Sequence, residues 1–188
     1  MEKLKEHHTT LLVGIYRNTK EKAACEESLN ELERLADTYG LKTLAKIACP
    51  IKKITPATFI GTGKVKEILA VAEDQNIDLV IFDDEITPYQ QRNLEKALKR
   101  SVIDRTELII EVFAQRAQSK EARLQIELAK VKYEMPRLKR LWTHLSRQVS
   151  GGAGYLKGEG EKQIELDRRL LRHRLVRLEK EIKEVRAQ

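Results

Sequence analysis

The hydrophobic period of the chain changes near residue 105, and this change limits the folds that the chain can adopt. Before residue 105, short apolar runs alternate with segments in which apolar residues recur every three or four positions. After residue 105, apolar residues recur at alternating spacings of four and three. Short buried runs are typical of strands, and sustained heptad spacing is typical of coiled-coil helices. We therefore expect two parts, over residues 1–105 and 106–188.

The first part is expected to form an α/β domain. We predict strands over residues 10–16, 41–48, 57–60, 78–82 and 100–103, and helices over 20–39, 64–75 and 88–98. Gly40 stands where a helix C-cap belongs, and Thr87 and Pro88 suit the N-cap and first position of the third helix. Strands that alternate with helices predict a small, mainly parallel sheet with flanking helices.

The second part contains two apolar seams separated by a short loop. The first seam consists of Leu124, Leu128, Val131, Met135, Leu138, Trp142, Leu145 and Val149, and the second of Ile164, Leu171, Leu175, Leu178, Ile182 and Val185. Two seams joined in this way predict a long antiparallel helical hairpin, a coiled-coil arm about 38 Å long. The same heptads would suit an oligomerisation coiled coil between chains. The short basic loop favours a hairpin within a monomer.

The loop between the seams is rich in glycine and lies in the basic part of the chain. Residues 137–177 carry eleven basic and four acidic side chains, and their balance of +7 equals that of all 188 residues. Five of the nine glycines fall between Gly151 and Gly160. A flexible loop in a patch of one sign suits a polyanion, with RNA as the first candidate. We call residues 150–161 the tip.

Candidate RNA-binding residues follow from this composition. Arginine and lysine contact phosphates, glycines allow close backbone approach, and a tyrosine can stack on an unpaired base. The candidates are Arg147, Gly151, Gly152, Gly154, Tyr155, Lys157, Gly158, Gly160, Lys162, Arg168 and Arg169.

A second candidate site is Gly61-Thr62-Gly63-Lys64, which stands between a predicted strand and a predicted helix. It differs from a phosphate-binding GxxxxGK[ST] loop twice, because Thr58 replaces the first glycine and Val65 replaces the hydroxyl residue. A helix N-terminus beside a lysine can still hold an anion. Both a tight structural turn and a nucleotide or anion site therefore remain open. Asp83-Asp84-Glu85 suits caps and solvated turns better than a metal site, so we expect no metal site.

Other features limit the remaining functional classes. Cys25 and Cys49 have no partner at metal-ligand spacing, which predicts buried free thiols and a reducing, cytoplasmic location. No run of 18 apolar residues exists, so we expect no membrane insertion. No arrangement of Ser, His, Cys and Asp typical of nucleophilic catalysis is apparent, and we predict no catalytic residue.

Several longer motifs resemble the N-terminal region of the HflX family of ribosome-associated GTPases. They run in order along nearly the whole chain: residues 59–65 (FIGTGKV), 80–85 (VIFDDE), 90–95 (QQRNLE), 102–109 (VIDRTELI), 113–117 (FAQRA), 136–138 (PRL), 141–148 (LWTHLSRQ), the glycine loop, and 165–169 (ELDRR).

The resemblance implies an α/β domain, a hairpin whose loop reaches the large ribosomal subunit, and a GTPase domain that would follow residue 188. The heptad pattern runs up to Gln188, and no glycine or proline there ends the helix. We therefore expect that the natural protein continues beyond this residue. The family splits or rescues stalled ribosomes, and its GTP and Mg²⁺ would belong to the missing domain. This segment is therefore expected to need no cofactor and to hydrolyse no GTP, although weak ATP binding by the α/β domain would also fit the family.

The glycine loop departs from the family pattern. The usual loop reads GGxG followed by TRGPGET, whereas here Gly154 is followed by YLKGEGEK, with Lys157 near the position of the usual arginine. The loop is one residue longer and lacks the proline and the threonine. The charge and flexibility of the tip are retained, and its detailed contacts are expected to differ.

Overall fold

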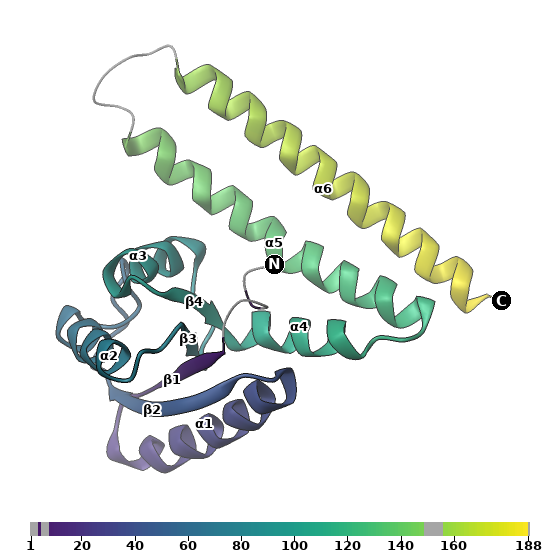
Figure 1. Ribbon diagram of the computed structural model, residues 1–188. Coiled ribbons are helices and arrows are strands. Elements are labelled where there is room, and N and C mark those ends of the chain that lie inside the picture. Colours follow the sequence, from purple (N-terminus) through teal and green to yellow (C-terminus); the bar gives the residue numbers. More distant parts are fainter. Residues whose placement is uncertain (1–3, 5–7, 149–155, 188) are drawn as a thin grey trace. The chain divides into compact units, whose positions relative to one another are not determined.

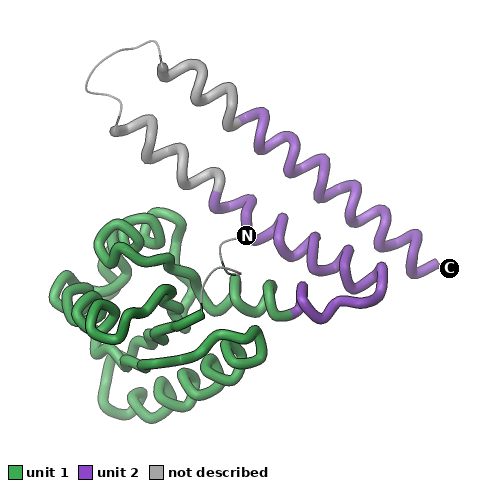
Figure 2. Tube along the Cα trace, in the orientation of Figure 1, with its two compact units in different colours: residues 1–112 green, residues 113–188 purple. Residues whose placement is uncertain are grey.

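The structure is a computed structural model that describes residue 4 and residues 8–148 and 156–187, of which 138–148 and 156–164 are described by their backbone (Figure 1). The chain divides into two compact units, Met1–Val112 and Phe113–Gln188 (Figure 2). The division falls after Val112 and not near 105. The reason is that a helix begins directly after the last strand, and its Leu108 and Val112 are buried in the core of the first unit.

The first unit alternates strands with helices along the chain. Its elements are β1 (Thr9–Tyr16), α1 (Thr19–Tyr39), β2 (Lys42–Pro50), α2 (Thr62–Asp74), β3 (Leu79–Phe82), α3 (Pro88–Leu98), β4 (Ser101–Asp104) and the greater part of α4 (Arg105–Arg116). The four strands form one sheet in the order β2-β1-β3-β4, and every neighbouring pair is parallel. The predicted α/β class with a small parallel sheet is confirmed.

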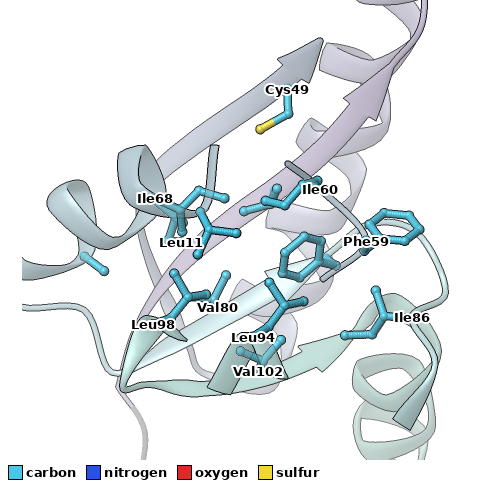
Figure 3. Close-up of a cluster of buried hydrophobic side chains, with 14 of the residues drawn as sticks. Leu11, Cys49, Phe59, Ile60, Ile68, Val80, Ile86, Leu94, Leu98 and Val102 are labelled. Atoms are coloured by element: carbon cyan, nitrogen blue, oxygen red, sulfur yellow. The ribbon is translucent and has the colours of Figure 1, made fainter. Parts of the chain in front are cut away.

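Apolar side chains cover both faces of this sheet. Because successive strand residues point to opposite faces, Leu11 and Val80 pack on the side of α2 and α3 (Figure 3). Leu12 and Ile81 belong to a second cluster with side chains from α1 and α4. Burial on both sides explains why β3 reads as an unbroken apolar run.

The predicted helix caps are present. Gly40 has φ 99°, in the left-handed region, and its N–H bonds to carbonyls of the last turn of α1. The Thr87 side chain accepts from the N–H of Gln90, whose own side chain accepts from the N–H of Thr87. This reciprocal pair is a capping box, and it fixes the start of α3.

The predicted strand over residues 57–60 is wrong. This segment forms only an isolated antiparallel bridge between Thr55 and Phe59, and Phe59 has φ 67°. A non-glycine residue rarely adopts that conformation, but here its buried ring packs edge-on against Phe82 with centroids 6.0 Å apart. The side-chain amides of Gln90 and Asn93 donate to carbonyls of the same loop at 3.3 and 2.9 Å. Tertiary burial therefore overrides the short apolar pattern.

Helix α3 also bonds to the strand next to it. The Gln91 side chain donates to the Val102 carbonyl at 2.6 Å, and the Val102 N–H donates to Glu95 Oε1 at 3.5 Å. Both backbone groups of a central β4 residue are thus satisfied by side chains of α3.

Both cysteines are buried and free, as predicted. Burial raises the pKa of the Cys25 thiol to about 11, with further contributions from Asp83 and Asp84. Burial also raises the pKa of Cys49 to about 11. Neither thiol is therefore ionised near neutral pH.

The second unit contains α5 (Lys120–Gln148) and α6 (Leu156–Arg186). Four side chains of the two seams, Leu124, Val131, Leu178 and Ile182, form a buried cluster. Ion pairs flank this cluster, with Glu127 contacting Arg174 and Glu121 contacting Arg186, both at 2.7 Å. An early residue of α5 thus meets a late residue of α6, so the described parts of the two helices run in opposite directions. No described helix is long and apolar enough to cross a membrane.

Candidate nucleic-acid interface

Much of the predicted RNA-binding tip lies outside the described residues. This applies to Gly151, Gly152, Gly154 and Tyr155. It applies also to the side chains of Arg147, Lys157 and Lys162, whose backbones belong to α5 and α6. Their predicted role therefore stays a prediction.

The glycine loop is shorter than the tip predicted from the sequence. Helix α6 begins at Leu156, so Lys157, Gly158, Gly160 and Lys162 have helical backbone. Each glycine costs about 1 kcal/mol in a helix relative to alanine. The residues beside these glycines, Lys157, Glu159 and Glu161, are good helix formers.

Beyond the loop, α6 presents a dense row of arginines. Arg168 lies 3.8 Å from Glu165, and Arg169 is exposed. Arg174 contacts Glu127 through Nε and Nη2 at 2.9 and 2.7 Å. These contacts fix some of the cations and leave others facing solvent.

At the start of the basic stretch on α5, an arginine stacks on an aromatic ring. The Arg137 guanidinium lies 3.6 Å from the centroid of the Tyr133 ring. Such a cation–π contact holds the guanidinium plane against the helix surface and contributes about 0.5–1 kcal/mol at an exposed site.

The turn formed by Gly61, Thr62 and Gly63 is exposed at the N-terminus of α2. Gly61 is the N-cap, and no side chain caps the first backbone N–H groups. A Cβ atom at Gly61 or Gly63 would meet nothing within 4 Å, so the backbone is open to a ligand. The Lys64 ammonium, however, bonds to Glu67 at 2.6 Å, and this bond raises the pKa of Lys64. The cation that would accompany an anion there is engaged by a carboxylate.

The carboxyl ends of β1 and β3 meet at the point where the strand order reverses, and the residues after β3 are acidic. Asp83 accepts a hydrogen bond from Arg105 at 2.9 Å. Burial raises the pKa of Asp84, with a further contribution from Asp83, while a bond from the Ile15 N–H and the charge of Arg17 oppose the rise. Among the described residues, no group of three or more His, Cys, Asp or Glu side chains could hold a metal ion.

Sequence reasoning missed the part played by Arg105. Its guanidinium contacts Ser28, Asp83 and Glu31, each at 2.9 Å. It therefore joins the start of α4 to α1 and to the end of β3. Its partners are 77, 22 and 74 residues away in sequence, so no local pattern could have indicated them.

Two family models match the chain in succession. Residues 26–114 match the N-terminal region of GTP-binding GTPases, and residues 116–188 match their middle region. Together the two matches account for nearly all residues after the first 25.

Curated HflX relatives are much longer than this chain. It is 49% identical over 178 residues to the GTPase HflX of Chlamydia pneumoniae, a match that covers 93% of the chain and 38% of the relative. It is 44% identical over 162 residues to the GTPase HflX of Escherichia coli, covering 86% of the chain and 38% of the relative. The chain belongs to the HflX family. This confirms the family expected from the sequence motifs, and the chain spans about two fifths of the length of these relatives.

A solved structure supports the fold of this HflX-family segment. The GDP complex of a GTP-binding protein from the hyperthermophilic archaeon Sulfolobus solfataricus superposes with a TM-score of 0.63 and 24% identity. The match covers 96% of the chain and 46% of the archaeal protein. At this identity the likeness concerns the fold alone.

Proposed function

We propose that this chain is the N-terminal part of an HflX-type GTPase that associates with the large ribosomal subunit in the cytoplasm and splits or rescues stalled ribosomes. The observation that carries the proposal is the pair of consecutive family matches, together with relatives named GTPase HflX of which the chain spans only 38%. GTP and Mg²⁺ would bind to a GTPase domain outside this segment. The chain itself would supply RNA binding and would hydrolyse no GTP.

In this proposal the second unit is a monomeric coiled-coil arm that presents the tip to ribosomal RNA. The support comes from the described part of the arm, where the two seams pack against each other within one chain. That packing uses the apolar faces that an intermolecular coiled coil would need. The excess positive charge of residues 137–177 would draw the arm toward phosphates.

The direct test is binding of the 188-residue chain to purified large ribosomal subunits over a salt series. A variant with Arg147, Lys157 and Lys162 changed to Gln, called the tip variant because these residues lie in the tip or beside it, removes three positive charges and keeps good helix formers. Removing three phosphate contacts should make the slope of log K against log salt shallower by about two to three. Equal binding by the variant and the parent would show that the tip is not the contact, and absence of binding by the parent would contradict the proposal.

A second candidate function is binding of a nucleotide or another anion at Gly61–Lys64. The uncapped N–H groups of α2 and the open space over both glycines favour it. The Lys64–Glu67 bond weighs against it. Saturable binding of ATP or GTP to this chain, lost in Lys64→Ala, would support this function, whereas ATP binding that survives Lys64→Ala would place the nucleotide elsewhere.

A further inference from the structure

Four cations and one valine form a line along α6 on the side turned away from α5. At about 100° per residue, Arg169, Arg172, Val176, Lys180 and Lys183 fall within an arc of about 80°. The centre of that arc lies about 140° from the second seam, which packs on α5. All four cations are exposed, and Val176 is 65% exposed. We call these five residues the outer stripe.

Three of the four cations of the outer stripe differ from the other arginines of α6 in their partners. The others form ion pairs with carboxylates: Arg168 with Glu165, Arg174 with Glu127, Arg177 with Glu181 and Arg186 with Glu121. In the part of the chain that the structure describes, no carboxylate forms an ion pair with Arg169, Arg172 or Lys183. Lys180 lies 3.8 Å from Glu184, and both side chains are more than half exposed. The outer stripe therefore keeps a local excess of positive charge.

We propose that the outer stripe binds the phosphate backbone of an RNA helix. From Arg169 to Lys183 it extends about 21 Å along a helix that its packing on α5 supports. Cations fixed in a line at this length can neutralise several successive phosphates and release their counterions. The inference rests on the proposed ribosomal function and extends its RNA contact from the tip along α6.

The composition of the outer stripe favours a double-stranded segment. Single strands are bound through aromatic side chains on which bases stack, and the outer stripe contains no aromatic residue. A-form helices are recognised through backbone and shape, which needs only placed cations. A membrane surface would need a broad apolar face. The exposed Leu166, Leu170 and Val176 are instead spread over an arc of about 120° that also contains Arg169 and Arg177.

Three variants with equal net charge test this inference. The stripe variant changes Arg172, Lys180 and Lys183 to Gln and leaves Arg169 in place, because Arg169 belongs to the tip proposal. The second variant is the tip variant described above. The control variant changes Lys20, Lys52 and Lys96 to Gln, three exposed lysines of the first unit. Each variant lowers the net charge from +7 to +4. Circular dichroism checks that the helices are retained.

Binding is measured by fluorescence anisotropy to an RNA duplex of about 20 base pairs, and in parallel to purified large ribosomal subunits, between about 50 and 200 mM salt. We expect the stripe variant to bind the duplex about 10- to 100-fold more weakly than the parent, with a salt slope shallower by about two to three. The control variant should stay within about threefold of the parent, because its charges lie on another unit.

Several outcomes would overturn the inference. Equal losses in the stripe and control variants would mean that net charge alone acts, and an unchanged stripe variant would mean that the outer stripe is a solvated surface. If the stripe variant bound subunits more weakly but bound the duplex like the parent, the partner of the outer stripe would be an acidic ribosomal protein and not RNA. If only the tip variant lost binding to subunits, the ribosomal function would stand and the outer stripe would have no part in it. If the parent bound the duplex through the outer stripe but did not bind subunits, the outer stripe would remain an RNA-binding surface and the proposed ribosomal function would be wrong.

Discussion

The contact between β1 and α1 depends on the absence of a side chain at Gly14. A Cβ atom there would lie 2.7 Å from Cys25 Sγ and 3.2 Å from Leu29 Cγ. Favourable contacts between such atoms begin at about 3.5 Å, so α1 or the cysteine would have to move. Overpacking of this kind costs about 1–3 kcal/mol, and the smaller conformational entropy of the unfolded alanine chain offsets about 0.4–1 kcal/mol of that. We therefore expect Gly14→Ala to lower the free energy of unfolding by about 1–2 kcal/mol.

Differential scanning calorimetry measures this loss as a fall in Tm. For a chain of this size, 1 kcal/mol corresponds to about 2–4 °C, so the expected fall is about 2–8 °C. Gly63→Ala is the matched control, since a Cβ at Gly63 meets nothing within 4 Å. Alanine is the better helix former, so this control should match the parent or exceed it by up to about 1 kcal/mol.

A double-mutant cycle identifies the atom responsible. Cys25→Ala removes the sulfur that a Cβ at Gly14 would meet, so Gly14→Ala should cost at least about 0.5 kcal/mol less in that background. The reasoning would be refuted if Gly14→Ala melted like Gly63→Ala, or if its cost were unchanged when Cys25 is alanine.

Three further predictions concern other parts of the chain. Leu178→Ala should destabilise the second unit by about 2–4 kcal/mol, because it leaves a cavity in the cluster between α5 and α6, and a calorimetric loss below 1 kcal/mol would contradict this. Asp84 has a raised pKa in the folded state, so its contribution to stability is present at low pH and is lost as pH rises through that pKa. Asp84→Asn should therefore gain stability relative to the parent more at pH 7 than at pH 4 in urea titrations, and equal differences at both values would disprove it. Cys25 and Cys49 have pKa values of about 11, so about one thiol in a thousand is ionised at pH 8, and a thiol reagent should label native protein far more slowly than unfolded protein. Equal labelling rates would show that the thiols are accessible.

Much of the α/β unit could be predicted because its local signals agree with its packing. The apolar run of β3 fits a strand covered on both faces, and Gly40 and Thr87 end and begin their helices as their chemistry requires. The segment 57–60 was mispredicted because its conformation depends on the burial of the Phe59 ring against Phe82. That contact joins residues 23 positions apart, and a short apolar run contains no information about it.

The candidate sites divide in a similar way. The charge excess and the glycine cluster are properties of composition and could be found in the sequence. Helix pairing decides part of which cations remain outside ion pairs, since Arg174 and Arg186 meet carboxylates 47 and 65 residues away on α5. The regular spacing of the outer stripe was visible in the sequence, but its significance depends on knowing which side of α6 the second seam occupies.

The bonds from α3 to Val102 have a consequence for how the sheet can grow. A strand recruits a neighbour through outward N–H and C=O groups, and edges that offer them invite pairing with other chains. At the centre of β4 the side chains of Gln91 and Glu95 already occupy both groups, much as a neighbouring strand would. An added strand would have to displace them, so pairing in that direction is opposed by side chains from the same fold. The opposite edge of the described sheet is β2, where Pro50 has no N–H to donate to an added strand.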